Sequence, residues 1–513
     1  MKLKSNILKI AIFATGLSGI VAEYILSTLA TYFLGDSVFQ WSMIVSVMLF
    51  SMGLGSRISK YFNDDLLVKF IAIEFVLSLL VSFSPLLAYI TASFTIYTGL
   101  IIYLLSILIG LMIGMEIPLV IRINDEMESL RVNVSSVIEN DYYGSLLGGL
   151  FFAFVALPYL GLTYTPFILG FINFSVAIFL FIVVSQHIKP VIKSKLVISA
   201  VSISIILVIG FFSAKPIIIF GEQNKYKDKV IYSEQSRYQK IVLTEWKGNH
   251  WLYINGNQQL STLDEIMYHE PLIHPIVNLS ENPANVLVLG GGDGCAVREL
   301  LKYEAIKNIT LVDLDPVMIE FAKTNPIMTE MNDNSLLNPK VDVKTTDGYI
   351  FVEETKDFYD IIIIDLPDPR TIELGRLYSL EFYKKCFKLL RPNGLIITQA
   401  GSPYYATNSF RCIDKTLKSA DFNTIMLHNQ ILTMGEWGWV LGSKNIKTEK
   451  LLENLHSLEY KNIDLKWLNN ESMKLLTSFG KNIYNIPAEE IKINTIHDPV
   501  LYRYYLNGNW DIY

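Results

Sequence analysis

The sequence predicts an α-helical membrane domain of about seven transmembrane helices, followed by a small β domain and a Rossmann-like, doubly wound α/β domain. Three observations predict this. The mean hydropathy is +0.35 and only 18% of the 513 residues are charged, which is too apolar for a soluble protein. The residues before about 214 form long apolar blocks. Those after about 284 alternate short apolar runs with stretches of helical periodicity.

The amino-terminal part contains seven apolar blocks, each long enough to cross a hydrocarbon layer of about 30 Å at about 1.5 Å per residue. The first block is too long for a removable signal peptide and lacks a small-residue cleavage site, so we expect it to remain in the mature protein. The blocks lie at about 8–34, 39–56, 66–91, 97–121, 134–158, 162–186 and 196–214.

Lysine and arginine gather in alternate connections between these blocks, so the positive-inside rule places the amino terminus in the cytoplasm. Seven crossings from an inside start leave the second half of the chain outside. Three interpretations stay open: one block does not span, the stretch PIIIF at 216–220 adds a crossing or a re-entrant segment, or the second half is external. The basic residues are Lys2, Lys4, Lys9, Arg57, Lys60, Lys69, Arg122, Arg131, Lys189, Lys193 and Lys195.

Three domains are predicted: a polytopic transmembrane domain at 1–214, a linker with a small β domain at 215–283, and the α/β domain at 284–513. Residues 228–256 alternate like short strands and close on an Asn-Gly turn. From 284 onward the runs NVLVLG, ITLVDLD, DIIIID and GLIITQA are spaced like parallel strands with crossover helices.

Charge and cysteine content exclude some function classes. The formal net charge of −6 and the isoelectric point near 5.8 leave no basic surface for nucleic acid, whereas a cationic ligand is compatible. The cysteines Cys295, Cys386 and Cys412 match no metal-ligand spacing, and we predict three buried structural thiols and no metal site.

Four predicted strands of the α/β domain end in aspartate. Ligands bind beyond the carboxyl ends of such strands, so these carboxylates converge on one site, which is costly unless a cation arrives. Asp313 is placed to accept hydrogen bonds from ribose hydroxyls. Asp315 before Pro316 is predicted to cap a helix. Asp347 before Gly348 is either a turn residue or a ligand contact, and both interpretations stay open. The acids are Asp293 (GGGDG), Asp313 and Asp315 (LVDLD), Asp347 (TTDGY), and Asp365 and Asp368 (IIIIDLPDP).

The motifs of residues 225–513 resemble the polyamine aminopropyltransferases, the spermidine synthase family. The apolar half is similar to that of multi-span bacterial members through GLSGIVAEYILS and NDYYGSLLGGL. The resemblance implies aminopropyl transfer from decarboxylated S-adenosylmethionine to a di- or polyamine, foremost putrescine to spermidine, with release of 5′-methylthioadenosine and without a cofactor. The motifs are SRYQKI (236–241), INGNQQLSTLDEIMYHE (254–270), GGGDGCAVRE (290–299), VDLD (312–315), DG (347–348), DLPDP (365–369), LYSLEFY (377–383) and INTIHDPVLYRYY.

The resemblance also implies a role for each matching residue. Asp293 would face the aminopropyl ammonium, and Asp365, helped by Asp368, would accept the proton. The donor-binding residues would be Gln239, Asp293, Asp313, Asp347, Gly348, Gly290 and Gly292, with Asp347 and Gly348 at the adenine. The acceptor-binding residues would be His269, Gln259, Asp293 and Asp368, and the catalytic residues Asp365, Asp368 and Tyr268.

Two of these acids meet electrostatic needs of the reaction. The donor has lost its carboxylate. In a donor with an intact methionine carboxylate about 4 Å from Asp293, repulsion between the two carboxylates would cost about 4 kcal/mol of binding free energy at an effective dielectric of about 20, roughly a thousandfold in affinity. The acceptor amine, with a pKa near 10.4, must lose a proton, which costs about 4.6 kcal/mol at pH 7. Asp365 can take that proton directly, or through Tyr268 or a water.

Several positions depart from the family pattern. Asn255 replaces an aspartate, Leu366 and Pro367 replace small polar residues, and Ile372 stands where a proline is usual. The segment HNQILTMGEWGW (428–439) lacks the tyrosine and proline that members use at the far end of the diamine. An acceptor other than putrescine therefore stays open.

Five carboxylates lie within or near the apolar blocks, where acids are costly and are functional candidates by default. One interpretation is pairing with Arg57 or Arg122, or protonation. The other is that Glu23, Glu116 and Asp141 line a polyamine path across the membrane. The five are Glu23, Glu74, Glu116, Glu139 and Asp141.

The expected partners are small amines, the nucleoside donor and the lipid bilayer, with no nucleic acid and with a homodimer left open. We expect a multi-pass cell-membrane protein whose catalytic domain faces the cytoplasm, because members of the family find their donor there, although the charge count argues for the other face. Two alternatives are a membrane-tethered S-adenosylmethionine methyltransferase, disfavoured by Asp293 and the acids of DLPDP, and a polyamine transporter or sensor with a catalytically silent domain.

Overall fold

The structure is a computed structural model that describes residues 2–35, 37–95, 97–125, 129–460, 463–480 and 490–510. All site residues predicted from the sequence lie within these ranges. The chain forms two compact units, Met1–Val230 (unit 1) and Ile231–Tyr513 (unit 2).

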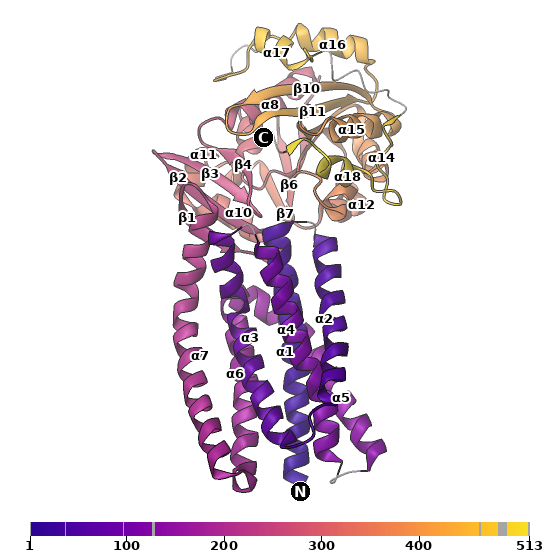
Figure 1. Ribbon diagram of the computed structural model, residues 1–513. Helices are drawn as coiled ribbons and strands as arrows, with labels where there is room; N and C mark the ends of the chain where they lie inside the picture. Colours follow the sequence, from indigo (N-terminus) through magenta and orange to yellow (C-terminus); the bar gives the residue numbers. More distant parts are fainter. Residues whose placement is uncertain are drawn as a thin grey trace. The chain divides into compact units, whose positions relative to one another are not determined.

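Unit 1 consists of long apolar helices that run along one another (Figure 1). They are α1 (Lys2–Leu34), α2 (Ser37–Ser59), α3 (Leu66–Phe94), α4 (Thr98–Asn124), α5 (Leu130–Phe151), the π-helix η1 (Phe152–Leu160), α6 (Gly161–Val184) and α7 (Pro190–Lys225).

Six helical runs within the described residues are long and apolar enough to cross a membrane, where the sequence predicted seven blocks. The difference arises because the blocks at 134–158 and 162–186 form one continuous run, Leu130–Val184, with no loop to separate them. The stretch 216–220 is no separate element, since it belongs to α7, which also contains the predicted domain boundary after residue 214.

Close contacts show which helices of unit 1 point the same way. A Cβ at Gly144 of α5 would meet Phe13 of α1, and one at Gly148 would meet Leu17, so the numbers rise together and the two helices are parallel. The pairs α2–α4, α1–α3 and α3–α7 are also parallel, because the residue numbers of their contacts rise together. The pairs α1–α4 and α3–α6 are antiparallel. Helices α1, α3, α5 and α7 therefore point one way, and α2, α4 and α6 the other.

The basic residues that the sequence singled out all belong to one end of these helices, the end where α1 begins. Arg57 and Arg122 lie in the last turns of α2 and α4, which end there. Arg122 donates to the carbonyl oxygens of Ser59 (3.0 Å) and Phe62 (2.5 Å). The chain leaves α7 at Lys225, at the opposite end.

Unit 2 contains two sheets, which confirms a sheet-containing α/β domain after the helical region. The smaller sheet has the order β1-β2-β3-β4, and the larger has the order β10-β11-β9-β8-β5-β6-β7, with β5 to β9 parallel and β11 antiparallel to its neighbours. The strands are β1 (Lys229–Gln235), β2 (Lys240–Trp246), β3 (Asn249–Ile254), β4 (Asn257–Ser261), β5 (Asn285–Gly290), β6 (Asn308–Asp313), β7 (Val341–Thr345), β8 (Tyr359–Asp365), β9 (Leu390–Gly401), β10 (Asn423–Ile431) and β11 (Gly435–Ser443).

Helices connect and cover the larger sheet, as the alternation of apolar runs and helical stretches predicted. They are α8 (Ile266–Leu279), α9 (Cys295–Leu301), α10 (Pro316–Thr324), α11 (Pro326–Met331), α12 (Gly348–Glu354), α13 (Ile372–Gly375), α14 (Leu380–Leu389), α15 (Thr407–Ser419), α16 (Thr448–His456), α17 (Asn470–Leu476) and α18 (Leu501–Leu506). All three cysteines are buried and free, as expected of structural thiols.

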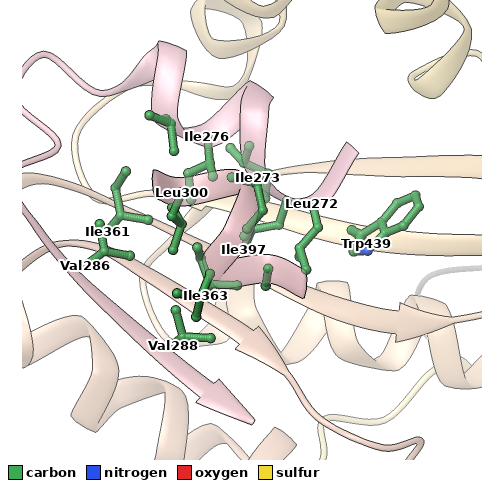
Figure 2. Close-up of a cluster of buried hydrophobic side chains, with 14 of the residues drawn as sticks. Leu272, Ile273, Ile276, Val286, Val288, Leu300, Ile361, Ile363, Ile397 and Trp439 are labelled. Carbon is green, nitrogen blue, oxygen red and sulfur yellow. The ribbon is translucent and has the colours of Figure 1, made fainter. Parts of the chain in front are cut away.

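Helix α8 is anchored on the larger sheet by buried aliphatic side chains. Figure 2 shows Leu272, Ile273 and Ile276 of α8 in one cluster with Val286 and Ile361 of the central strands, and all five are fully buried. Burying each such side chain contributes roughly 1.5–3 kcal/mol. The sequence grouped this helix with the small β domain, but it packs in the core of the α/β domain. This packing fixes the first turn of α8 relative to the ends of β5 and β8.

Candidate active site

The strand order places the site at the carboxyl ends of β5 and β8. Strand β5 has β6 on one side and β8 on the other, so the connections diverge there, which is where ligands bind in open α/β sheets. Gly290, at the end of β5, pairs with Asp365, at the end of β8.

The glycines at the end of β5 and in the loop after it are required by close approach to Asp365 and Asp313. Gly290 has a φ of 80°, and a Cβ on it would lie 2.1 Å from the carbonyl oxygen of Asp365. A Cβ on Gly291 would lie 3.2 Å from Asp365 Oδ2, and one on Gly292 would lie 2.6 Å from Asp313 Oδ2. The loop thus brings the acids of β6 and β8 against one short stretch of backbone.

Asp293 stands in this loop, two residues before α9 begins. Its Oδ1 accepts a hydrogen bond from the backbone N–H of Cys295 (2.8 Å) and lies 4.0 Å from Nε2 of His269. Its side chain is 17% exposed, so the carboxylate remains open to a ligand.

His269 is a buried cation beside Asp293. Its Nδ1 lies 2.7 Å from Oε2 of Glu265, one turn earlier in the chain, and Arg298 binds both oxygens of Glu265 (2.8 and 2.9 Å). Burial by itself lowers the pKa of His269, but the hydrogen bond and charge of Glu265, with the charges of Asp293 and Asp365, raise this pKa to about 9. The imidazole is therefore protonated at neutral pH.

Asp365 and Tyr268 form the hydrogen-bonded pair of the site. The Tyr268 hydroxyl donates to Asp365 Oδ1 (2.7 Å), and its ring packs against Trp439 of β11 with ring centroids 5.3 Å apart. Burial raises the pKa of Asp365 to about 6; the charge of His269 and the Tyr268 hydrogen bond oppose this rise, and the charge of Asp293 adds to it. A carboxylate with that pKa is ionised at pH 7 and is well matched to accept a proton.

Asp368 is held by three side chains. Its Oδ2 accepts from the hydroxyl of Tyr505 (2.6 Å), its Oδ1 from Nε2 of Gln399 (3.5 Å), and Nη2 of Arg370 lies 3.6 Å from Oδ2. Burial raises the pKa of Asp368, and the charge of Arg370 opposes this rise. Arg370 also donates to Tyr505 (3.0 Å) and to Asn257 of β4, which ties the DLPDP loop to the small sheet.

The acids of β6 divide into a ligand candidate and a cap. Asp315 caps α10, as predicted, by accepting from the N–H of Val317 (3.0 Å), and it also accepts from Ser236 Oγ (2.6 Å). Asp313 Oδ1 accepts from the N–H of Asp315 (2.9 Å), and burial raises its pKa to about 6. The backbone N–H of Ser236 donates to the carbonyl oxygen of Gln239 (2.9 Å), so the Ser236–Asp315 contact holds the half-buried Gln239 close to the end of β6.

Asp347 and Gln259 both use their polar side-chain groups in contacts with neighbouring protein groups. The carboxylate of Asp347 caps α12, which begins at Gly348, through the N–H groups of Tyr349 and Ile350, and it also binds Arg376. Gln259 Nε2 donates to the carbonyl oxygens of Asn257 and Gln258, both at 3.2 Å. Their ligand-binding roles stay predictions.

Three groups of side chains have the proximity that a metal ion needs, and the third is engaged in hydrogen bonds with the protein. They are Glu265–His269–Cys295, His269–Asp293–Asp365 and Glu270–His274–Glu299. The carboxylate of Glu270 accepts three backbone N–H groups, from Lys466, Trp467 and Leu468. Both nitrogens of His274 are engaged, with Tyr303 and Glu299. These contacts describe polar networks of the protein itself.

The structure adds residues that the sequence did not single out. Glu265 could have been found from its spacing of four from His269 within a helical motif. Arg370 directly follows DLPDP, but its position in the sequence does not indicate that its side chain contacts the carboxylate of Asp368. Tyr505 lies 137 residues from Asp368 and within the tail that the resemblance covered, so its contact depends on the tertiary fold.

Comparisons with known proteins show what the chain is similar to. The family model described as "Spermine/spermidine synthase domain" matches residues 265–453. A protein named polyamine aminopropyltransferase 2 from Aquifex aeolicus (strain VF5) is 44% identical over 506 residues, 98% of each chain. A polyamine aminopropyltransferase from Oceanobacillus iheyensis is 38% identical over 96% of each chain. A solved spermidine synthase in complex with the transition-state analogue AdoDATO is 28% identical, covers 50% of this chain and 87% of its own, and has a TM-score of 0.46.

Proposed function

Because this chain belongs to the polyamine aminopropyltransferases and is an aminopropyl-transferring enzyme, we propose that its acceptor is putrescine and its product spermidine. Decarboxylated S-adenosylmethionine is the aminopropyl donor and a co-substrate rather than a resident cofactor. The membership removes the methyltransferase interpretation. The observation that most supports the residue roles below is the meeting of Asp293, Asp365 and Tyr268 at one glycine loop.

The donor would lie along the ends of β5 and β6. Asp313 would accept hydrogen bonds from the ribose hydroxyls, with Gln239 nearby and with Gly348 and Asp347 toward the adenine. Gly290 and Gly292 would contact the donor through their backbone atoms, since neither carries a side chain. Asp293 would attract the aminopropyl ammonium.

The acceptor would enter between α8 and the DLPDP loop, with its reacting nitrogen at Asp365 and Tyr268. The amine loses a proton to Asp365, its lone pair forms a bond to the carbon beside the sulfonium, and the carbon–sulfur bond breaks with its electrons going to sulfur. The products are 5′-methylthioadenosine and the extended amine. Because His269 is protonated, it would orient Asp293 and Asp365 rather than take the proton itself.

The far ammonium of the diamine would bind Asp368. The Arg370–Asp368 separation of 3.6 Å is longer than the 2.7–2.9 Å of a strong charge-assisted hydrogen bond, and the Arg370 side chain is 38% exposed. An incoming ammonium can therefore replace the guanidinium at Asp368. Gln259 of β4 would contact the chain between the two nitrogens.

We expect putrescine to be the best acceptor, with spermidine formed in equal amounts to 5′-methylthioadenosine. Chromatography of products from putrescine, cadaverine and spermidine as competing acceptors measures this. Replacing Arg370 by Gln removes the competitor at Asp368, so the KM for putrescine should fall about two- to fivefold, as expected for a weak, half-exposed ion pair. A higher turnover with spermidine than with putrescine would contradict the acceptor assignment.

Unit 1 would lie in the lipid bilayer. The run Leu130–Val184 has 55 residues, which at about 1.5 Å per residue is more than twice the thickness of about 30 Å that a single crossing needs. Gly161 has a φ of 62° and interrupts this run, and its two halves pack along different helices, α5 on α1 and α6 on α3. Two crossings from this run give seven in total.

With seven alternating crossings, the basic end of unit 1 and Lys225 lie on opposite faces of the membrane, so the charge count and the supply of donor favour different faces for unit 2. The positive-inside rule places the basic end of unit 1 in the cytoplasm and Lys225 on the other face. Donor supply requires unit 2 in the cytoplasm. We propose the cytoplasmic face, because an enzyme without access to its donor has no activity, and the charge rule is a bias in topology rather than a requirement.

Protease protection in sealed vesicles measures the face. In inside-out vesicles we expect trypsin to digest residues 225–513, with unit 1 protected, and in right-side-out vesicles we expect unit 2 to stay intact. A detergent-opened sample controls for intrinsic resistance. Digestion only in right-side-out vesicles would contradict the cytoplasmic face and agree with the charge count.

A further inference from the structure

Glu265, the residue directly before α8, binds two basic side chains at once. Its carboxylate accepts from Arg298 of α9 through both oxygens, Oε1 from Nη1 (2.8 Å) and Oε2 from Nη2 (2.9 Å). Oε2 also lies 2.7 Å from Nδ1 of His269, one helical turn later. The side chains of Glu265, His269 and Arg298 are only 5%, 3% and 13% exposed. We call these three residues the ion triad.

The ion triad fixes the ring of His269. Nδ1 lies close to two groups that accept hydrogen bonds, Oε2 of Glu265 and the backbone carbonyl oxygen of the same residue (3.0 Å), so this nitrogen carries a proton. Arg298 is itself held in place, because its Nε donates to Oε1 of Glu299 (2.8 Å). A guanidinium that binds both oxygens of a carboxylate sets the orientation of that carboxylate. The other ring nitrogen, Nε2, lies 4.0 Å from Asp293.

The two acids proposed for the reaction meet at this ring. His269, Asp293 and Asp365 each contribute one nitrogen or oxygen atom, and these atoms all lie within 4.8 Å of one another. Two carboxylates this close disfavour each other's ionisation, whereas a neighbouring cation favours it. The charge of Asp293 raises the pKa of Asp365, and the charge of His269 lowers it. A neutral His269 would therefore leave Asp365 protonated over a wider range of pH.

The other ionisable groups that face His269 do not supply a positive charge. Tyr268, whose ring centroid lies 5.0 Å from that of His269, and Cys295 both stay neutral, because burial raises the pKa of each. The rest are acids. From the described part of the chain, the groups facing His269 are Glu265 and Tyr268 of its own segment, Asp293 and Cys295 of the glycine loop and α9, and Asp365 of β8.

We propose that Glu265, held by Arg298, is a positioning residue for aminopropyl transfer, which keeps His269 as a cation facing Asp293 and Asp365. Both acids then stay ionised before the two cationic substrates bind. Glu265 acts through His269 and is not itself the base. The inference rests on the proposed function, because it takes Asp365 as the proton acceptor and Asp293 as the contact of the donor.

The pH profile of kcat/KM tests this role, measured on the full chain in lipid nanodiscs with decarboxylated S-adenosylmethionine and putrescine. Glu265→Gln removes the anion that binds the imidazole and leaves Arg298 beside it, so His269 loses its proton at neutral pH. The acid limb should move up by roughly one to two pH units, because a charge about 5 Å from Asp365 is lost at an effective dielectric of about 20. Relative to wild type, kcat/KM should fall about two- to tenfold at pH 7 and recover to within about twofold at pH 8.5.

Three further variants separate the role of charge from that of structure. His269→Gln keeps the Glu265–Arg298 pair and should move the acid limb in the same direction. Adding Glu265→Gln to that variant should cause no further shift, because the two residues act as one unit. Glu265→Asp keeps the charge on a shorter side chain and should move the limb less than Glu265→Gln. Glu304→Gln is the matched control, since Glu304 is exposed in the turn after α9, and it should leave the profile unchanged.

A loss of kcat/KM by the same factor at every pH would overturn the proposal, because a purely structural role predicts that result. A Glu265→Gln shift of equal size with and without His269 would overturn it as well. If Glu265→Gln does not fold, His269→Gln and Glu265→Asp decide, and an acid limb at the wild-type position in both would contradict the proposal. Wild-type turnover of Asp365→Asn would instead count against the proposed proton acceptor.

Discussion

Replacing Asp365 by Asn is expected to lower kcat for aminopropyl transfer by about a thousandfold, because general base catalysis contributes about 10²–10⁴-fold and asparagine cannot accept the proton. The amide keeps the oxygen that accepts from the Tyr268 hydroxyl, so the shape of the site survives. The Kd for decarboxylated S-adenosylmethionine, measured by calorimetry, should change by less than about threefold, since a neutral group replaces only one of the nearby acids.

Asp357→Asn is the matched control, since this aspartate is exposed and precedes the same strand. It should retain wild-type turnover. If Asp365→Asn turns over at the wild-type rate, the proton goes elsewhere and Asp365 is not the acceptor.

The pH profile tests the same assignment without abolishing activity. Asp365 must be ionised to accept a proton, and its pKa is raised to about 6, so kcat/KM should fall about tenfold per pH unit below that value. The Tyr268 hydrogen bond lowers this pKa, and Tyr268→Phe should therefore move the acid limb to higher pH. A limb that stays in place, or moves to lower pH, would show that another group titrates.

Replacing Asp293 by Asn is expected to narrow the affinity gap between decarboxylated S-adenosylmethionine and S-adenosylmethionine by about a hundredfold. A charge about 4 Å from the donor carboxylate is worth roughly a thousandfold, and the protonated His269, whose Nε2 lies 4.0 Å from Asp293, offsets part of it. Asparagine retains the oxygen that accepts from the N–H of Cys295, so the substitution removes charge and preserves the loop.

Calorimetric titration with both nucleosides gives the ratio directly. Binding of the decarboxylated donor should weaken and binding of S-adenosylmethionine should tighten. An unchanged ratio would place donor selectivity in another residue, and His269→Gln would then be the variant to measure.

The fold of unit 2 and the core of its site follow from local sequence patterns. Parallel strands that end in acid meet at one sheet edge, so Asp293, Asp313 and Asp365 could be placed together without tertiary information. The cap at Asp315 was also predictable, because a carboxylate before a proline bonds the free N–H groups of the next turn.

Other features depend on packing between distant segments. The apolar face of α8 gives no sign of whether it covers the small sheet or the larger one. Tyr505 meets Asp368 and Arg370 only after the tail folds back. In unit 1, no polar loop separates α5 from α6, so the apolar blocks at 134–158 and 162–186 join in one helical run.

Competition between the two donors tests the central claim most directly, namely that an acidic cleft selects a donor without a carboxylate. The wild-type enzyme is supplied with putrescine and equal concentrations of decarboxylated S-adenosylmethionine and S-adenosylmethionine, and the nucleoside products are quantified by mass spectrometry. We predict 5′-methylthioadenosine and spermidine in equal amounts and no S-adenosylhomocysteine. Formation of S-adenosylhomocysteine, or strong inhibition by equimolar S-adenosylmethionine, would contradict the claim.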